Sequence, residues 1–310
     1  WVDLIEANAP DHIYVGGISD HESLAEKPEL SGAAFYAYNV ALAREFAALL
    51  GNADDAARFE ALGERIAEAF NARYLEPETG RYGAGTQASQ AFALYMNLAP
   101  EPVRANALEV LVNDITAHDG HLSTGIFGTK YMLDVLSAMG RHDVACAITS
   151  ARTFPGWGYM LDNGATTLWE HWEGSDNTFS NNHPMFGSVS EWFYKHVAGI
   201  RPAPDAVGCD RVIIAPGPPQ PGLDWAEASY DSVRGTIRAA WRVDGGRLHL
   251  AVTVPVGVTA RVLLPVDARA EVLESGVPAN QAAGVAPASG DARCPAFDVA
   301  SGAYRFSVKM

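Results

Sequence analysis

Residues 31–73 read "SGAAFYAYNVALAREFAALLGNADDAARFEALGERIAEAFNAR" and predict two consecutive helices. In residues 31–50 the apolar side chains recur at helical spacing, with Ala between them. Residues 53–73 repeat the pattern, and Asp54 and Asp55 lie in the first turn, where the helix dipole favours negative charge. Gly51-Asn52 ends the first run. The stretch is therefore typical of a helical hairpin closed by a tight turn.

Five further stretches in the first 200 residues have the same helical character. They are "TQASQAFALYMNL", residues 101–117, "TKYMLDVLSAMG", "HDVACAITSA" and "GSVSEWFYKHVA". Short turns alternate with longer loops rich in Gly, His, Ser and aromatic residues, as in a toroid of helical hairpins that carries functional loops on one rim. Seven helices are too few to close a ring of six hairpins, so we predict an incomplete toroid of helical hairpins over residues 1–200.

The pattern changes from Arg201 onward, where Pro/Gly turns separate short runs of alternating apolar and polar residues. Such runs predict an antiparallel β-sandwich over residues 201–310. Residues 212–214 and 262–264 are expected to be inner-face strands. This second domain shows no cluster of chemically competent residues, and we interpret it as structural.

Composition excludes several classes of function. The 310 residues are 48% hydrophobic and 19% charged, as in a globular protein, and no apolar run is long enough to span a bilayer. A net charge of −15 argues against nucleic acid as a partner. No motif for a metal or another cofactor is present, and the three cysteines are expected to be small buried hydrophobes. Because the sequence begins at Trp1 without a signal peptide, we expect preceding residues to be missing; cellular location and oligomeric state are not indicated.

Residues 156–194, "GWGYMLDNGATTLWEHWEGSDNTFSNNHPMFGSVSEWFY", gather four of the seven Trp with two His and five acidic side chains. Indole faces stack on sugar rings, whereas hydroxyl groups need polar side chains. The segment offers Trp157, Trp169 and Trp172 for the ring faces, and Asp162, Asn163, Asn181, Asn182 and His183 for the hydroxyl edges. The composition therefore favours a sugar-cleaving site over an ordinary core.

Glu170 is the candidate catalytic residue of this segment, because Trp169 and Trp172 flank it. A carboxylate among indoles is expected to be desolvated, which would raise its pKa and suit it to accept a proton. Trp192 is expected to be core, and Glu191 on the same helix to be a structural partner. His171 is interpreted as a surface or supporting residue.

A polar loop, Ser19-Asp20-His21-Glu22, precedes the first long helix. Asp20 and His21 are candidates for binding the sugar. The alternative is a capping segment before the helix at residue 31.

The segment from "GWGYMLDNGATTLWEHW" to "NNHPMFGSVSEWFYKHVAGIRP" strongly resembles the bacterial α-L-rhamnosidases of glycoside hydrolase family 78. The resemblance extends to "GHLSTGIFGTKYMLDVL" and "GGISDHESL" upstream and to the sandwich downstream. It implies the C-terminal part of an (α/α)6 barrel followed by a β-sandwich, and an inverting hydrolysis that releases terminal α-L-rhamnose from glycosides or polysaccharide side chains.

The resemblance also implies residue roles. Glu170 in "LWEHW" matches the general base of the family, and His183 in "NNHPMFG" matches a sugar-contacting His. The general acid of the family comes from an Asp-x-x-x-Arg-x-Glu motif, which we expect to lie before Trp1. The chain is therefore predicted to be a fragment without its general acid. Acids within the chain are a less favoured alternative; the candidates are Asp20, Glu22, Asp162 and Glu173.

Two other functions are compatible with the residues alone. One is a different sugar hydrolase, phosphorylase or lyase on the same helical toroid, although few Arg in the segment argue against a lyase. The other is a non-catalytic carbohydrate-binding protein that uses the same Trp and Asn groups.

Overall fold

The computed structural model describes residues 1–174, 180–288 and 294–310. The chain separates into two compact units, Trp1–Ser188 and Val189–Met310. The predicted helix at 187–198 falls across this division, and the predicted domain boundary after residue 200 stays a prediction. None of the helices in the described ranges is long and apolar enough to cross a bilayer.

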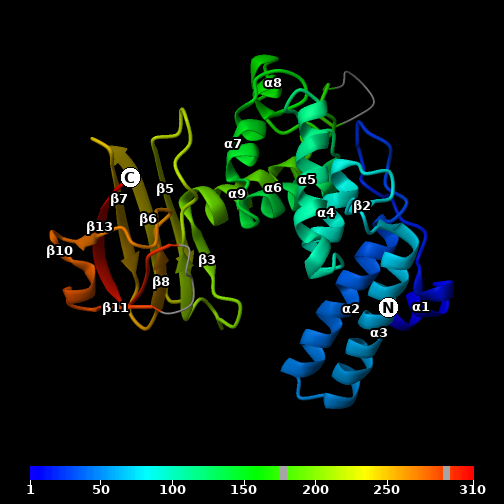
Figure 1. The fold of residues 1–310 in the computed structure, drawn as a ribbon, viewed down its shortest axis with the longest axis horizontal. Coiled ribbons are helices and arrows are strands. Elements are labelled where there is room, and N and C mark those ends of the chain that lie inside the picture. The colour runs from blue at the N-terminus through cyan, green and yellow to red at the C-terminus, as the bar shows by residue number, and fades with distance from the viewer. Residues whose placement is uncertain (175–179, 289–293) are drawn as a thin grey trace. The chain divides into compact units, whose positions relative to one another are not determined.

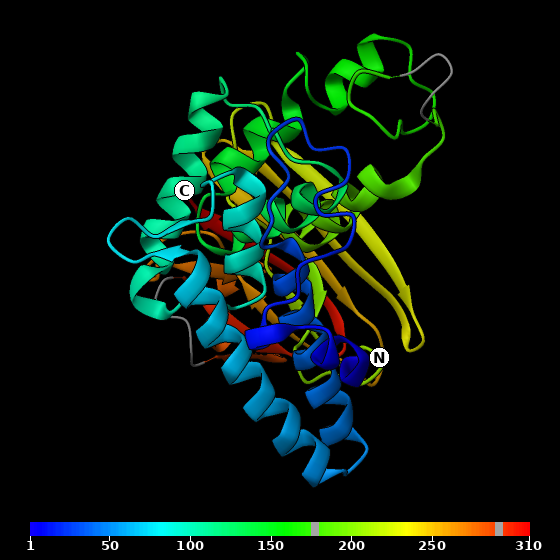
Figure 2. The ribbon, with the colours of Figure 1, turned by 90° about the vertical axis from the view of Figure 1, so that its right-hand side faces the viewer.

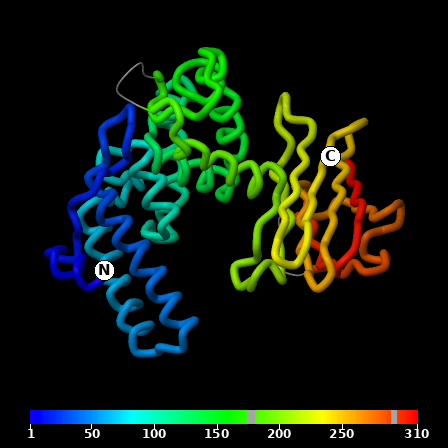
Figure 3. The backbone as a smooth tube through the Cα atoms, turned by 180° about the vertical axis from the view of Figure 1, so that it is seen from behind, coloured from blue at the N-terminus to red at the C-terminus, as the bar shows by residue number. Residues whose placement is uncertain are grey.

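The first unit is built from three successive helix pairs (Figures 1 and 3). Two short elements precede them, α1 (Val2–Ala7) and η1 (Pro10–His12). The pairs are α2 (Ser31–Leu49) with α3 (Ala53–Tyr74), α4 (Gln87–Tyr95) with α5 (Glu101–Ala117), and α6 (Ile126–Ala138) with α7 (His142–Ser150). The small ladder of β1 (Leu75–Glu76) and β2 (Arg81–Tyr82) follows α3. The hairpin predicted from residues 31–73 is confirmed, and the Asn52 side chain caps α3 by accepting a hydrogen bond from the Asp55 N–H.

The first members of the three pairs, α2, α4 and α6, pack against one another in sequence order. Helix α4 is buried on all sides from Gln87 to Leu94, so its polar side chains need internal partners. The Gln90 amide accepts a hydrogen bond from the Tyr82 N–H and donates to the carbonyls of Gly80 and Ala107. An inner helix fastened in this way to neighbouring elements is what the inner layer of a hairpin toroid requires.

The remaining helical elements of this region are short. Helix α8 (Trp157–Asp162) was not expected from the sequence. The predicted helix at 187–198 is present as a succession of η2 (Pro184–Ser188, a 3₁₀ turn), α9 (Val189–Trp192) and η3 (Phe193–Ala198, a π-helix). Trp192 is buried, as predicted. None of the three cysteines forms a disulfide; only Cys146 is buried, whereas Cys209 and Cys294 are half-exposed, against the prediction.

The second unit is a two-sheet sandwich (Figure 1). The first sheet has the order β10-β9-β13-β7-β6-β5, and the second β11-β12-β8-β4-β3. The first-sheet strands are β5 (Trp225–Ser232), β6 (Gly235–Asp244), β7 (Arg247–Val254), β9 (Val272–Glu274), β10 (Val277–Pro278) and β13 (Gly302–Lys309). The second-sheet strands are β3 (Ile200–Pro202), β4 (Arg211–Ile214), β8 (Thr259–Leu263), β11 (Val285–Pro287) and β12 (Ala296–Val299), with η4 (Ala279–Gln281) between β10 and β11.

Buried and outer side chains alternate along the strands, as the sequence predicts. Val212 and Ile214 of β4 are buried, as is Val262 of β8, whereas Ile213 lies on the outer face. Strands β4 and β8 pair in parallel, whereas the other strand pairs described in this unit are antiparallel. Figure 2 shows the long strands of the first sheet, of which β6 and β7 are joined by Gly245-Gly246, both with positive φ, as a two-residue hairpin demands.

Candidate active site

The loop that carries Asp20 is anchored to the N-terminus of α6. The Asp20 carboxylate is fully buried and accepts hydrogen bonds from the N–H groups of Gly125 (2.7 Å) and Gly128 (2.8 Å). Burial raises the pKa of Asp20 to about 6, although these backbone hydrogen bonds oppose the rise. Because both carboxylate oxygens are engaged inside the protein, Asp20 positions the loop and does not supply the predicted sugar contact.

The approach of this loop to α6 leaves no room for a side chain at the helix start. The Ile126 N–H donates to the His21 carbonyl at 2.8 Å, and a Cβ on Gly125 would lie 2.0 Å from that same oxygen. Glu22, which directly follows His21, has a left-handed backbone with φ of 61°. Such a conformation is costly for a residue other than Gly and is frequent at functional sites. The packing therefore fixes where His21 and Glu22 point.

An aromatic cluster anchors the segment that carries Glu170. Trp172 is completely buried, its indole N–H donates to the Thr124 carbonyl at 2.9 Å, and its ring lies 3.9 Å from that of Phe186. Trp157 meets Trp172 edge-on at 5.2 Å and donates its own N–H to the Phe186 carbonyl. Trp172 thus has a packing role in place of the predicted sugar contact. Trp157 and Trp169 are half-buried, and Trp169 covers Gly174.

Glu170 has one oxygen bound and one open. Both its backbone and its side chain are bonded to Ser180: the Glu170 N–H donates to the Ser180 carbonyl at 2.9 Å, and the Ser180 N–H donates to Glu170 Oε2 at 2.8 Å. Oε1 lies 3.7 Å from His21 Nε2 and 3.9 Å from His183 Nδ1. The structure therefore brings Glu170, His183 and His21 together, although they are far apart in the sequence.

The electrostatics of Glu170 differ from the prediction. The pKa of this carboxyl lies below its usual value, chiefly because the Ser180 N–H donates a hydrogen bond to the carboxylate. Desolvation raises the pKa by less than this hydrogen bond lowers it, and the nearby His183 and His21 lower it further. The predicted rise is wrong because the Trp172 indole is buried in the core, and the carboxylate instead meets an N–H donor and two imidazoles. A lowered pKa keeps Glu170 ionised at neutral pH, which suits a base and not an acid.

Glu22 belongs to the same cluster; the sequence indicates it as part of the polar loop and as an alternative acid. Its side chain is 12% exposed; Oε1 lies 3.3 Å from His21 Nδ1, and Oε2 lies 3.8 Å from His171 Nε2. His21 thus stands between two carboxylates, and His171 lies behind Glu22 as a supporting residue. The sequence signal for this role was the position of Glu22 directly after His21.

The other acids named from the sequence lie outside this cluster. Asp162 forms an ion pair with Arg152, and Glu173 is exposed to solvent. Glu191 pairs with Lys195 one helical turn away, the structural role that was predicted for it.

The three Asn residues predicted to contact sugar hydroxyl groups are more exposed than Glu170 and His183. Asn163, Asn181 and Asn182 have exposed side chains. Of the described residues, no group of three or more His, Cys, Asp or Glu has a geometry that could hold a metal ion.

The letters of the acidic motif of the family do occur within the chain, at Asp54–Glu60, contrary to the expectation that the motif lies only before Trp1. They lie on the solvent side of α3, where Arg58 pairs with Asp3 and Glu6, and Glu60 lies 3.7 Å from Arg44. Surface ion pairs explain these residues, so this match does not supply the general acid.

Comparison with known proteins identifies the family. The model for the bacterial alpha-L-rhamnosidase 6 hairpin glycosidase domain matches residues 10–197, and that for the bacterial alpha-L-rhamnosidase C-terminal domain matches residues 199–279. An alpha-L-rhamnosidase of Streptomyces avermitilis is 37% identical over 285 residues, which cover 89% of this chain and 26% of the relative. One from Formosa agariphila is 33% identical over 77% of the chain and 26% of the relative. The chain thus spans about a quarter of the length of these curated relatives.

Solved structures agree with this assignment. The Streptomyces avermitilis alpha-L-rhamnosidase complexed with L-rhamnose superposes with a TM-score of 0.90 at 33% identity, covering 100% of this chain and 30% of the other. The enzyme from Dictyoglumus thermophilum gives a TM-score of 0.90 at 31% identity, with 100% and 36% covered. The predicted fold class, part of a six-hairpin glycosidase domain followed by a β-sandwich, is confirmed. The chain belongs to the bacterial α-L-rhamnosidase family.

Proposed function

We propose that this chain provides the general base and part of the sugar pocket of an inverting α-L-rhamnosidase, with a rhamnose-containing glycoside as substrate. The observation that carries the proposal is the Glu170 carboxylate, with Oε2 held by the Ser180 N–H and Oε1 directed toward His21 and His183. The chain matches rhamnosidases over most of its length, and one of these was solved with L-rhamnose.

In this mechanism Glu170 Oε1 accepts a proton from a water molecule as that water attacks the anomeric carbon. An inverting enzyme needs about 6.5–9.5 Å between base and acid so that the water fits. The fixed Oε2 leaves Oε1 in one orientation, which positions the base before the substrate arrives. We propose that the general acid lies on a segment outside this sequence, because the acids described near Glu170 are engaged elsewhere. Glu22 contacts His21 and His171, Asp162 pairs with Arg152, and both oxygens of the buried Asp20 accept backbone hydrogen bonds.

His183 and His21 are the proposed sugar contacts, since both imidazoles face the open carboxylate oxygen and both are partly exposed. Trp157 and Trp169 remain the candidates for stacking on the sugar, because each keeps part of its ring accessible. Glu22 lies behind His21 and is proposed to orient its ring through the 3.3 Å contact with Nδ1.

The test separates binding from turnover. In the complete enzyme that contains this chain, Glu170→Gln should retain rhamnose binding but lower kcat by at least about 10²–10⁴-fold. His183→Ala should weaken rhamnose binding, measured by NMR titration. Glu173→Gln is the matched control, since it neutralises an exposed carboxylate three residues away. Near-normal turnover by Glu170→Gln would remove Glu170 from the reaction.

A further inference from the structure

The outer face of the first sheet of the sandwich carries an exposed indole among cationic side chains. Strands β5, β6, β7 and β13 lie side by side in this sheet (Figure 1). Trp225 pairs with Arg242, and Arg242 pairs with His249. Because paired residues share a face of the sheet, these three side chains form a cross-strand row. Trp225 is 68% exposed.

A hollow of about 630 Å³ lies over this row. Its floor includes the small side chains of Ala240 and Ala251, which pair with each other across β6 and β7, and Arg305 on β13 continues that second row. The three intervals from β5 to β13 span about 14 Å at the usual strand spacing of 4.7–4.9 Å. The hollow is therefore long enough for several linked sugar rings.

Two of the arginines on this face have no internal counter-charge. The guanidinium groups of Arg242 and Arg305 have no ion pair or hydrogen bond with any residue in the described part of the chain, whereas Arg238 lies 3.6 Å from Glu227. The hollow is also lined by one carboxylate, Glu227, which lies 3.6 Å from Arg238. Because Arg242 and Arg305 lack such a partner, they can pair with an anionic group from outside.

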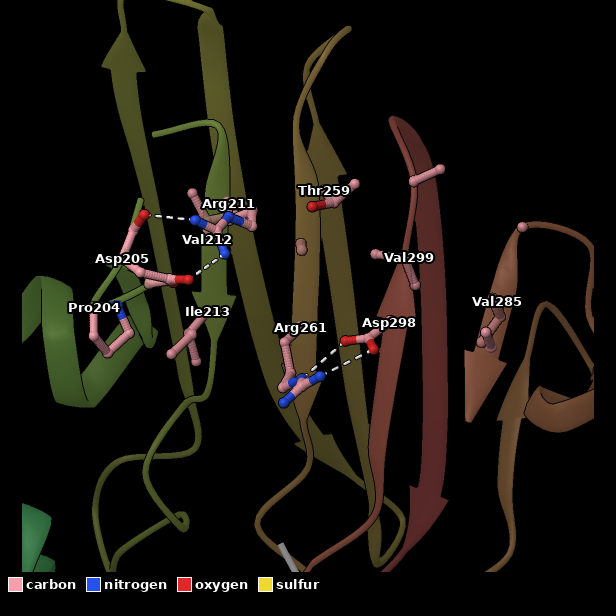
Figure 4. A pocket seen from close by; sticks show the side chains of 15 residues that line it. Pro204, Asp205, Arg211, Val212, Ile213, Thr259, Arg261, Val285, Asp298 and Val299 are labelled. Carbon is pink, nitrogen blue, oxygen red and sulfur yellow. Dashed lines mark hydrogen bonds and ion pairs between the residues drawn. The ribbon is translucent and has the colours of Figure 1, made fainter. Parts of the chain in front are cut away.

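The second sheet provides a contrast. Its outer face has a larger hollow of about 810 Å³, shown in Figure 4. There Arg261 forms two hydrogen bonds with Asp298, at 2.8 and 3.0 Å, and Arg211 pairs with Asp205. Every charged side chain that lines that hollow is matched, and no aromatic residue lines it. The outer face of the second sheet therefore has neither an aromatic residue nor an unpaired arginine at its hollow.

We propose that the Trp225 face is a binding site for an acidic oligosaccharide, separate from the cluster around Glu170. Trp225 offers a flat apolar surface on which a sugar ring can stack, and Arg242 and Arg305 can each bind a uronate carboxylate through two parallel hydrogen bonds. His249, beside Arg242, supplies a further polar contact. A neutral sugar would leave both guanidinium groups unmatched, so the charge selects a uronic acid.

The experiment titrates the 310-residue chain with α-1,4-linked trigalacturonate by isothermal calorimetry at low and high salt. We expect saturable binding that weakens with salt and is at least about tenfold tighter than binding of neutral galactotriose. Trp225→Ala and the double variant Arg242→Gln/Arg305→Gln should each lose about tenfold or more. Tyr230→Ala, on the same strand but with its side chain on the alternate side, and Arg269→Gln, in the exposed loop before β9, are the matched controls.

Several results would overturn the proposal: no binding at millimolar trigalacturonate, equal affinity for galactotriose, or unchanged affinity in both face variants. Equal competition by a triglutamate peptide would reveal an unspecific anion patch and would also overturn it. Glu170→Gln should leave trigalacturonate affinity unchanged. Since rhamnose binding is measured in a separate titration, failure of this proposal is distinguishable from failure of the proposed rhamnosidase function.

Discussion

The two Trp residues that flank Glu170 should lose very different amounts of stability on substitution. Trp172 is fully buried, stacks on Phe186 and donates to the Thr124 carbonyl. Replacing a buried Trp by Ala costs about 3–5 kcal/mol, and the lost hydrogen bond leaves the carbonyl unsatisfied at a further cost of about 1 kcal/mol. We therefore expect Trp172→Ala to lower the free energy of unfolding by about 4–6 kcal/mol. Trp169→Ala, at a half-buried position, should cost about 1 kcal/mol or less.

The assay is urea unfolding followed by circular dichroism, together with an NMR titration of rhamnose binding for each folded variant. A loss of 4–6 kcal/mol is comparable with the whole stability of many domains, so Trp172→Phe serves as the milder variant. It keeps an aromatic ring but loses the N–H donor, and we expect it to cost about 1–2 kcal/mol while rhamnose still binds. The reasoning would be refuted if Trp172→Ala cost less than about 1 kcal/mol and abolished rhamnose binding, because Trp172 would then be a sugar contact.

Three further predictions concern charge and close packing. The pKa of Asp20 is raised from 3.8 to about 6 in the folded state, so this group favours folding increasingly as the pH falls through 6. The gain in the free energy of unfolding reaches about 3 kcal/mol at pH 3.8 and below. Urea unfolding at a series of pH values should show this gain in the wild type and lose it in Asp20→Asn. Gly125→Ala places a Cβ 2.0 Å from the His21 carbonyl oxygen, so its thermal midpoint should fall by several degrees or more. The control Gly63→Ala, within α3, should lack this clash, because the nearest atom to its new Cβ is Val40 Cγ1 at 3.9 Å. Because the pKa of Glu170 lies below 4.5, the acidic limb of the kcat profile should fall below that pH; a limb near pH 6 would contradict the assignment.

Local sequence patterns predicted the long helices and several of the strands. The apolar spacing in residues 31–73 and the break at Gly51-Asn52 predicted α2 and α3, which end and begin within one residue of the predicted positions. Helical spacing is a property of neighbouring residues and needs no tertiary information. Strand β5, "WAEASYDS", was missed because its outward residues include both Trp225 and polar side chains, so its alternation is weak as a hydrophobic signal.

In the candidate site, local sequence patterns did not predict which side chains are buried. The sequence singled out Glu170, and His183 and His21 beside it, but it could not show which flanking indole turns inward. Trp169 and Trp172 are three residues apart in an irregular loop, where no regular period assigns each to a face. The wrong expectation of a raised Glu170 pKa followed from placing both indoles beside the carboxylate.

The amino-acid sequence by itself determined the helical hairpins, the sandwich, the family and the Glu170 base candidate, because these depend on residue type and on spacing between near neighbours. Only the tertiary structure decided the pKa direction of Glu170, the burial of Trp172 and Asp20, and the place of Glu22 between His21 and His171. Those properties depend on contacts between residues that lie 10, 48, 105 or about 150 positions apart in the chain. Electrostatic and packing energies follow distance in space, not distance along the sequence.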